Sequence, residues 1–404
     1  MTDGAGLRVG VVGCGYWGSK HVRVVHGLNA VERVAVIDPS TERTLQLTRN
    51  FPDLDSYATL DEALPHLDAV IIATPPSTHR PLALKAIAAG VHVMVEKPLA
   101  TTSADAREMI DAANAAGVVL MVGHTFEYHS AVWKLREMVQ NKELGDLYYL
   151  DTARLNLGLY QNDCNVLFDL APHDVSILNY VLGAKPTSVR CWSARHAHRR
   201  LEDVGYMRLY YESADVIANV HVSWLDPCKV RRITLVGSEK MVIFNDLATD
   251  ERIKVHDKGV SERPFAGEDL TQPPMSYRYG DVVSPYLTVN EPLMVEDEHF
   301  LDCAVTGTHP LTDGENGMAV VQVLEAAQLA ATLGREVRID ELAGAGALNG
   351  SNALNGSNGH NGSNGHNGHN GSNGTNGHNE ANGHNGLPST TLESVVPAGV
   401  GEPQ

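Results

Sequence analysis

The chain has little of what marks a secreted, membrane or nucleic-acid-binding protein. It has only five cysteines in 404 residues and no C-x-x-C pair, so neither a zinc site nor a disulfide framework is indicated. No apolar run reaches the ~18 residues of a spanning helix, and the residues before the first motif lack the basic region and apolar run that a signal peptide needs. Basic residues are outnumbered 31 to 49, and the net charge of −18 disfavours nucleic acid and anionic membranes. We expect a cytoplasmic protein with reduced thiols and neither of those partners.

The length of the chain and the pattern of its apolar segments predict an α/β protein with two folded domains. A chain of 404 residues exceeds one ordinary hydrophobic core. Over residues 1–128, short apolar runs alternate with helical stretches, which is typical of a doubly wound parallel sheet with helices on both faces. Over residues 129–342, longer strands joined by direct turns predict an α+β domain with a large, open, mostly antiparallel sheet.

Periodicity places the expected elements within these two domains. Strands are expected at 7–12, 33–37, 69–73, 92–95 and 118–122, and then at 188–195, 205–211 and 216–224. Helices are expected at 81–89, 103–116, 175–182, 296–306 and 317–333. We expect the last two helices to return and pack on the first domain.

The final segment, 343–404, has almost nothing to bury. It is dominated by Asn, Gly and His, so it cannot offset the entropy of ordering, and we expect it to be disordered. Weak metal binding by its histidines is one interpretation, but the composition favours a solvated tether. These histidines are His360, His366, His369, His378 and His384.

The turn after the first strand predicts a dinucleotide site. Gly13-Cys14-Gly15-Tyr16-Trp17-Gly18 is a G-x-G-x-x-G that opens a helix. The first glycine allows the tight turn, the second lets the backbone approach a pyrophosphate, and the third lets helix and strand pack. We expect Gly13, Gly15, Gly18 and the intervening Tyr16 and Trp17 to contact the cofactor.

Asp38 indicates which dinucleotide binds. It lies 20 residues beyond Gly18, at the end of the second expected strand. A carboxylate there accepts hydrogen bonds from the adenine ribose and repels a 2′-phosphate, which favours NAD over NADP. Two alternatives stay open: Asp38 starts a turn with Pro39 or caps the next helix, and Arg43 serves the phosphate of NADP.

A second loop follows the third expected strand at its carboxyl end, the edge where doubly wound sheets bind ligands. It reads Thr74-Pro75-Pro76-Ser77-Thr78-His79. We expect Thr74, Pro75 and His79 to contact the cofactor. Turn chemistry alone is the alternative explanation for the prolines, and for His79 it is the favoured one.

Val95-Glu96-Lys97-Pro98 ends another strand at the same edge. We expect Glu96 and Lys97 to line the cofactor site, with Lys97 pointing into the cleft between the domains. A surface lysine beside a turn proline is the alternative, and it is the usual fate of a lysine.

Asp169 and His173, four residues apart, form a second group of candidate catalytic residues in addition to Lys97. On a helix this spacing puts both side chains on one face, and Pro172 suits the first turn of such a helix. A carboxylate beside an imidazole fixes its tautomer and raises its basicity, which suits a general base. The alternative is that Asp169 is a helix cap and His173 a structural histidine.

The order and spacing of these motifs resemble the glucose-fructose oxidoreductase, inositol dehydrogenase and rhizopine-catabolism family over residues 7–340. The matching pieces are VGVVGCGYWG, ATPPSTH, MVEKPLA, VGHTFEYHSAV, KELGD and DLAPHDVSIL. The resemblance implies an N-terminal Rossmann domain, a nicotinamide-dependent enzyme acting on a ring carbon of a sugar, cyclitol or nucleotide sugar, and a homodimer or homotetramer. It matches Lys97 to the family's EKP lysine, and Asp169 and His173 to its D-x-x-x-H pair.

The groups available then predict the chemistry. His173, polarised by Asp169, is expected to take the hydroxyl proton, while Lys97 hydrogen-bonds the developing alkoxide. The reverse assignment of Lys97 and His173 stays open. No metal is expected, because a zinc alcohol dehydrogenase would show clustered Cys and His ligands.

The stretch RLNLGLYQNDCNVLFDLAPHD resembles enzymes acting on nucleotide-activated or amino sugars, including the UDP-N-acetylglucosamine 3-dehydrogenase type, which favours C3 as the reacting carbon. A free cyclitol or an aminoglycoside sugar unit is the alternative substrate, and a non-catalytic NAD-sensing regulator is the alternative of another class. Further substrate contacts are expected from Asn156, Tyr160 and Asn165, although loop packing also explains them. His124 and Glu127 follow the fifth expected strand on the edge that faces the cofactor.

Overall fold

A computed structural model describes residues 6–161, 163–262, 275–288 and 290–342. The tail predicted at 343–404, with its five histidines, lies outside these residues. No helix within the described ranges is both long and apolar enough to cross a membrane.

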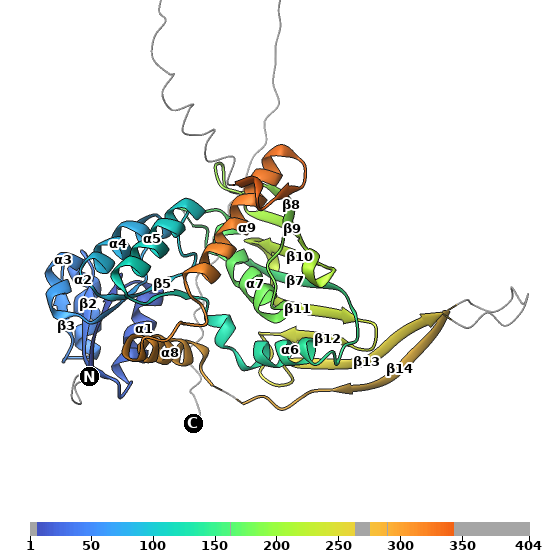
Figure 1. The fold of residues 1–404 in the computed structure, drawn as a ribbon, viewed down its shortest axis with the longest axis horizontal. Coiled ribbons are helices and arrows are strands. Elements are labelled where there is room, and N and C mark those ends of the chain that lie inside the picture. Colours follow the sequence, from blue (N-terminus) through green and yellow to red (C-terminus); the bar gives the residue numbers. More distant parts are fainter. Residues whose placement is uncertain (1–5, 162, 263–274, 289, 343–404) are drawn as a thin grey trace, which may run out of the picture. The chain divides into compact units, whose positions relative to one another are not determined.

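The first sheet has six parallel strands in the order β3-β2-β1-β4-β5-β6 (Figure 1). The order reverses between β1 and β4, and doubly wound sheets bind ligands outside the carboxyl ends of their strands at such a switch point. The strands are β1 (Leu7–Val12), β2 (Val31–Ile37), β3 (Asp55–Tyr57), β4 (Ala69–Ile72), β5 (His92–Glu96) and β6 (Leu120–Gly123). The predicted parallel sheet is therefore confirmed, with β3 as an additional edge strand.

Helices connect these strands and cover the sheet. In α5, Thr102 accepts the N–H of Asp105 at the start, and Gly117 in the left-handed conformation ends the helix. The helices up to the second sheet are α1 (Tyr16–His26), α2 (Thr41–Asn50), α3 (Leu60–Ala63), α4 (His79–Ala88), α5 (Ser103–Ala116) and α6 (Ser130–Gln140). Short 3₁₀ turns are η1 (Leu64–His66), η2 (Pro76–Thr78), η3 (Thr125–Tyr128) and η4 (Glu212–Ala214).

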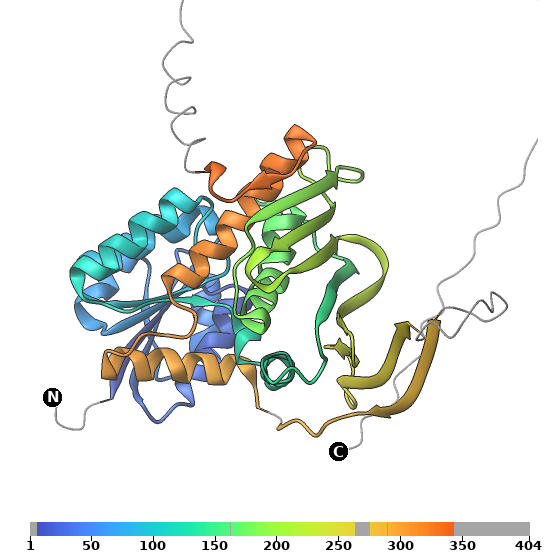
Figure 2. The same ribbon diagram turned by 45° about the vertical axis from the view of Figure 1, so that its right-hand side comes forward.

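Two late helices return to this first sheet. α8 (Pro292–Thr306) packs beside α1 (Figure 2). Its Phe300 and Leu301 are buried with residues of β1 and β4. In α9 (Gly314–Leu333), Met318 and Val321 join the core on the other side of the sheet, while later residues of α9 join the core of the second sheet. The expected return of both helices is confirmed.

The second sheet has nine strands in the order β14-β13-β12-β11-β7-β10-β9-β8-β15. All neighbours are antiparallel except β7 and β10, so the predicted large, mostly antiparallel sheet is confirmed. α7 (Val166–Leu182) and α9 pack in the core on one face. The strands are β7 (Leu147–Leu157), β8 (Ser188–Ala194), β9 (Val204–Tyr211), β10 (Val216–Ser223), β11 (Leu225–Gly237), β12 (Met241–Asn245), β13 (Ile253–Glu262), β14 (Met275–Val283) and β15 (Val337–Arg338).

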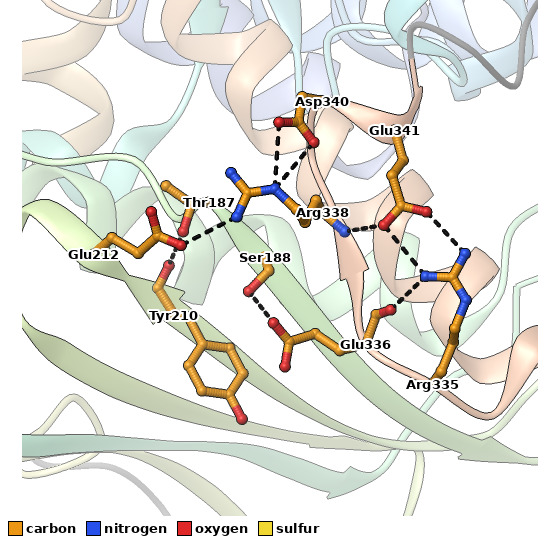
Figure 3. A network of polar contacts seen from close by, with 9 residues as sticks. All are labelled: Thr187, Ser188, Tyr210, Glu212, Arg335, Glu336, Arg338, Asp340 and Glu341. Atoms are coloured by element: carbon orange, nitrogen blue, oxygen red, sulfur yellow. Dashed lines mark hydrogen bonds and ion pairs between the residues drawn. The ribbon is translucent and has the colours of Figure 1, made fainter.

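Strand β15 ends the sheet beside β8. Polar residues of the segments 187–188, 210–212 and 335–341 form a network there (Figure 3). The Arg338 guanidinium donates to Glu212 at 3.2 Å, and the Arg335 guanidinium donates to Glu341 at 2.8 Å. The Arg335 guanidinium and the Arg338 N–H lower the pKa of Glu341 to about 2. Such exposed pairs add little stability, so the backbone pairing with β8 and the buried Val337 are what hold this last strand.

The structure corrects the predicted start of the helix that carries His173. The Asn165 side chain accepts the N–H of Phe168, so α7 begins at Val166 and Pro172 lies inside the helix, not in its first turn. Proline has no N–H to donate, so the turn before it lacks one helical hydrogen bond. The Lys97 ammonium donates to the Asp169 carbonyl in that turn at 2.8 Å.

Candidate active site

The glycine-rich turn fits a dinucleotide pyrophosphate. Gly13 has φ +92°, and a Cβ there would lie 2.6 Å from the Ala73 carbonyl oxygen, while a Cβ at Gly18 would lie 1.7 Å from the Gly13 oxygen. A Cβ at Gly15 would meet nothing within 4 Å. The first and third glycines are thus required by packing. The second faces open space at the N-terminus of α1, where N–H groups bind phosphate.

Tyr16 and Trp17 flank this turn on its exposed side. Their relative exposures are 72% and 39%, and their rings meet edge to face with centroids 5.5 Å apart. Both aromatic side chains are therefore accessible next to the open position at Gly15.

Asp38 joins the glycine-rich turn to the end of β2. One carboxylate oxygen accepts the Cys14 N–H at 2.8 Å and the other accepts the Ser40 N–H at 2.8 Å, while Arg43 lies 3.6 Å away. The turn role considered from the sequence is thus present. A carboxylate has about four acceptor sites, so these two bonds leave capacity for a ribose diol. The side-chain set at this edge fits NAD.

The structure places His79 as a buried connector. Its Nδ1 lies 2.9 Å from the Pro98 oxygen and its Nε2 lies 2.8 Å from the Thr74 oxygen, and burial lowers its pKa. Because a neutral imidazole carries one N–H, His79 donates to one of these two carbonyl oxygens, and its ring lies between the Thr74 loop and the Lys97–Pro98 turn. Thr74 accepts a hydrogen bond from the Thr78 hydroxyl at 2.7 Å, and Pro75 precedes η2.

Glu96 belongs to a buried charged cluster, which we name the His21 triad: His21, Glu96 and Asp297. His21 Nε2 lies 3.1 Å from Glu96 and Nδ1 lies 2.9 Å from Asp297, while Glu96 also accepts the Lys97 N–H at 3.0 Å. Burial opposes a charged imidazole, but the two carboxylates raise the pKa of His21 well above 6.5. The triad ties α1, β5 and α8 together directly behind Lys97.

Lys97 and Asp169 meet although they lie 72 residues apart. The Lys97 ammonium donates to the Asp169 carbonyl at 2.8 Å, in the turn before Pro172, and lies 3.4 Å from its carboxylate. The other carboxylate oxygen accepts the Trp224 indole N–H at 2.9 Å. The predicted meeting of Lys97 with the helix of Asp169 and His173 is therefore found. Trp224 is an additional residue of this site that the sequence did not indicate.

The expected pairing of Asp169 with His173 is not found among the described residues. The Asp169 carboxylate is used by Trp224 and Lys97 instead, and His173 Nδ1 is buried without a partner. Burial, and then the charges of Lys97 and Arg154, lower the pKa of His173 well below 6.5. His173 is therefore a neutral imidazole with a nitrogen available to accept a proton.

Several buried polar atoms without a hydrogen-bond partner lie on residues near Lys97 and Trp224. Both nitrogens of His124, Oδ1 of Asn156 and the Tyr160 hydroxyl have no hydrogen-bond partner. Burial lowers the pKa of His124 to about 4, so it too is neutral. The Asn156 oxygen and the Trp224 indole both lie against Gly158, and the Tyr160 ring lies 5.2 Å from that indole. Buried polar groups normally find partners, so this set fits a ligand rich in hydroxyls.

Two other candidates lie in structural roles. Asn165 caps α7 through Oδ1 and donates to Glu202 at 2.9 Å through Nδ2, so both ends of its amide are engaged. Glu127 is fully buried, and burial raises its pKa to about 8. It lines a cavity of about 460 Å³ that includes none of Lys97, Asp169 and His173.

The arrangement can bind a hydroxyl, take its proton and stabilise the resulting oxyanion. Lys97 supplies a positive charge, and His173 supplies a neutral base. Among the described residues, no three His, Cys, Asp or Glu side chains are grouped to hold a metal ion.

Comparison with protein families gives two adjacent matches. Residues 7–124 match the model of an oxidoreductase family with an NAD-binding Rossmann fold. Residues 132–243 match the model of the GFO/IDH/MocA C-terminal domain. The two matches follow the order of the two sheets.

Individual proteins are similar over most of the described chain. A D-apiose dehydrogenase of Paraburkholderia graminis is 25% identical over 349 residues, covering 82% of this chain and 89% of the relative. A UDP-N-acetylglucosamine 3-dehydrogenase of Acidithiobacillus ferrooxidans is 32% identical over 190 residues, 46% of this chain and 57% of the relative. The structure of GenD2 from gentamicin A biosynthesis in complex with NAD has a TM-score of 0.68 and 27% identity, covering 82% of this chain and 96% of that one.

Proposed function

Because the chain belongs to the oxidoreductase family with an NAD-binding Rossmann fold and a GFO/IDH/MocA C-terminal domain, we propose that it is an NAD(H)-dependent sugar dehydrogenase. It interconverts a ring carbinol and the corresponding ketone. The observation that carries this proposal is the contact of the Lys97 ammonium with Asp169 at 2.8 Å, which joins the sheet edge of the first domain to the helix of His173.

The side chains divide the work of alcohol oxidation. NAD, when bound, supplies the hydride acceptor. Lys97, positioned by Asp169, donates a hydrogen bond to the hydroxyl oxygen as it becomes an alkoxide, and such a donor lowers the barrier by about 2.7–4 kcal/mol. His173 takes the hydroxyl proton, because its lowered pKa keeps it neutral at pH 7. Asp169 acts as the positioning residue of Lys97.

The proposed substrate is a nucleotide-activated sugar that reacts at C3. The resemblance of residues 154–174 to UDP-N-acetylglucosamine 3-dehydrogenases supports this substrate. A sequence identity of 32% over 190 residues to one such enzyme supports it as well. The unpartnered atoms of Asn156, Tyr160 and His124 supply groups for sugar hydroxyls.

The test is NAD+ reduction with a panel of sugars, cyclitols and nucleotide sugars, followed by absorbance of the reduced nicotinamide. Lys97→Ala and His173→Ala are compared with Lys185→Ala, an exposed lysine in the loop after α7. We expect the first two variants to bind NAD but lose turnover, and the third to behave as the parent. Turnover by both active-site variants at the parent's rate would contradict the assignment. A parent that binds NAD without any turnover would favour the sensor alternative.

We also propose that the chain forms a homodimer or homotetramer through the open face of the second sheet. Tyr149, Trp192 and Tyr206 are exposed on that face, with relative exposures of 40%, 55% and 48%. Exposed aromatic side chains in neighbouring strands are typical of interfaces between subunits.

A further inference from the structure

The loop between β8 and β9 concentrates positive charge in a chain whose net charge is −18. Residues 195–200, which we name the basic loop, read Arg-His-Ala-His-Arg-Arg. The side chains of Arg195, Arg199 and Arg200 are exposed. Arg195 lies 3.7 Å from Glu202, but within the described part of the chain Arg199 and Arg200 have no ion-pair partner. Two guanidinium groups thus lie on one loop without an ion-pair partner among the described residues.

The backbone of the basic loop is fixed from within the domain. The buried Asp203 carboxylate accepts the N–H groups of His196 at 3.0 Å, Ala197 at 2.7 Å and His198 at 3.3 Å. His198 Nδ1 in turn accepts the N–H of Arg200 at 3.1 Å. Burial opposes ionisation of Asp203, but these N–H groups lower its pKa, so it stays charged. The loop is preorganised, and a ligand that binds it need not order it first.

The basic loop lies directly beside the candidate active site. The His198 ring stacks on the Tyr160 ring with centroids 6.3 Å apart, and the Tyr160 ring lies 5.2 Å from Trp224. The Trp224 indole donates to Asp169, and the Trp224 backbone N–H donates to the Asp203 carbonyl at 2.9 Å. The same tryptophan therefore contacts both the residue that positions Lys97 and the residue that fixes the loop.

We propose that Arg199 and Arg200 bind the diphosphate of a nucleotide-sugar substrate while the sugar ring occupies the site of Lys97 and His173. Guanidinium groups bind phosphate oxygens in pairs of charge-assisted hydrogen bonds. Of the acidic groups that contact the loop, Glu202 pairs with Arg195 and the Asp203 carboxylate faces backbone N–H groups inside the loop, so neither forms an ion pair with Arg199 or Arg200 among the described residues. A polycationic aminoglycoside is repelled there, and a neutral cyclitol gains nothing from the charge. This inference rests on the proposed function and names the charge of its substrate.

The test uses the full chain with Arg199→Ala and Arg200→Ala combined. The matched control combines Arg49→Ala, at the end of α2 away from Asp38, with Lys185→Ala, so both double variants remove two exposed positive charges. UDP, dTDP and inorganic pyrophosphate are titrated against each protein, with thermal protection and calorimetry as readouts, and NAD is titrated separately. We expect the loop variant to bind UDP about 10- to 100-fold more weakly, with NAD affinity and thermal midpoint unchanged and the control equal to the parent.

Two outcomes overturn the inference: UDP binds the loop variant as tightly as the parent, or UDP fails to bind the parent. If the parent then oxidises a free sugar with NAD+, the NAD(H)-dependent sugar dehydrogenase activity stands, while the nucleotide-sugar substrate and the role of the loop are both wrong. If UDP binding depends on the two arginines but no nucleotide sugar, free sugar or cyclitol is oxidised, the loop assignment stands and the proposed function fails.

Discussion

At the scale of single residues, the state of His173 makes a pH dependence predictable. Burial and the neighbouring charges of Lys97 and Arg154 lower its pKa well below 6.5. A general base with a lowered pKa stays active as the pH falls through 6.5 and is protonated only below it. We therefore expect the acidic limb of kcat/KM to lie below pH 6.5. His173→Ala should remove that limb and reduce kcat about 10²–10⁴-fold. A limb at or above pH 6.5 that survives in His173→Ala would contradict this.

The His21 triad gives a second prediction, on stability. His21→Leu leaves Glu96 and Asp297 buried on either side of an apolar side chain, and breaking such a buried pair costs about 3–5 kcal/mol. Because the folded pKa of His21 is raised, its stabilisation is fully present below the unfolded value and is lost as the pH rises through the folded value. The difference between parent and variant in denaturant unfolding should be largest near pH 6 and shrink at alkaline pH.

His26→Leu is the matched control for this variant. His26 lies on the same helix and pairs with Asp53 at 2.9 Å, but on the surface. We expect only a small change in its unfolding free energy, because water screens an exposed pair. An equal loss in both variants would show that the His21 triad contributes nothing beyond a surface pair. Glu296, also buried against this cluster, and Lys97 are the other ionisable groups that such a titration has to account for.

The sequence could predict that Lys97 and Asp169 meet, but not all of their partners. The meeting of Lys97 with Asp169 followed from two motifs at one edge of the fold. The spacing of Asp169 and His173 only says that both lie on one helix face. It cannot show that Trp224, 55 residues away, takes the Asp169 carboxylate. Asp297 lies 276 residues from His21, so no local pattern links them.

At the scale of elements, we expect alanine to have opposite effects at two positions of the glycine-rich turn. Gly18→Ala places a Cβ 1.7 Å from the Gly13 oxygen, so the turn or α1 must shift, and we expect a loss of at least about 1–3 kcal/mol of unfolding free energy. Gly15→Ala meets no atom within 4 Å, so its stability should equal that of the parent. Its methyl group lies where a pyrophosphate approaches, so NAD affinity should fall at least about tenfold.

Thermal unfolding and NAD titration of both variants separate these effects. If Gly15→Ala binds NAD as the parent does, the open position at Gly15 is not where the pyrophosphate lies. If Gly18→Ala is as stable as the parent, the contact with Gly13 is relieved by a movement that the backbone tolerates.

Each strand and helix that received a range from the sequence is found, and two differences show what the sequence could not predict. Strands with apolar runs, such as Leu7–Val12, and helices with clear caps, such as Ser103–Ala116, match the predicted ranges. β3 was missed because Asp55–Tyr57 is short and has no buried residue. The start of α7 was placed too late, because Pro172 suggested a first turn while the cap supplied by Asn165 lies seven residues earlier.

At the scale of the whole molecule, the two faces of the second sheet have different neighbours. One face packs against α7, which carries Asp169 and His173. The same face packs against α9, whose residues join the two cores. On the other face, register pairs place Trp192 beside Tyr206 and Tyr206 beside His221 across β8, β9 and β10, with ring centroids 6.0 and 3.9 Å apart. We name these three residues the aromatic row. A subunit contact there leaves the catalytic face untouched.

The aromatic row makes the oligomer testable without disturbing the chemistry. Trp192→Glu combined with Tyr206→Glu places two carboxylates on the proposed interface, where like charges from two subunits repel. Leu45→Glu, an equally exposed apolar side chain on α2, is the control. In sedimentation velocity over a range of concentrations we expect the parent and the control to stay associated and the double variant to dissociate, with its NAD affinity retained. A double variant that keeps the parent's sedimentation coefficient would place the subunit contact on another surface.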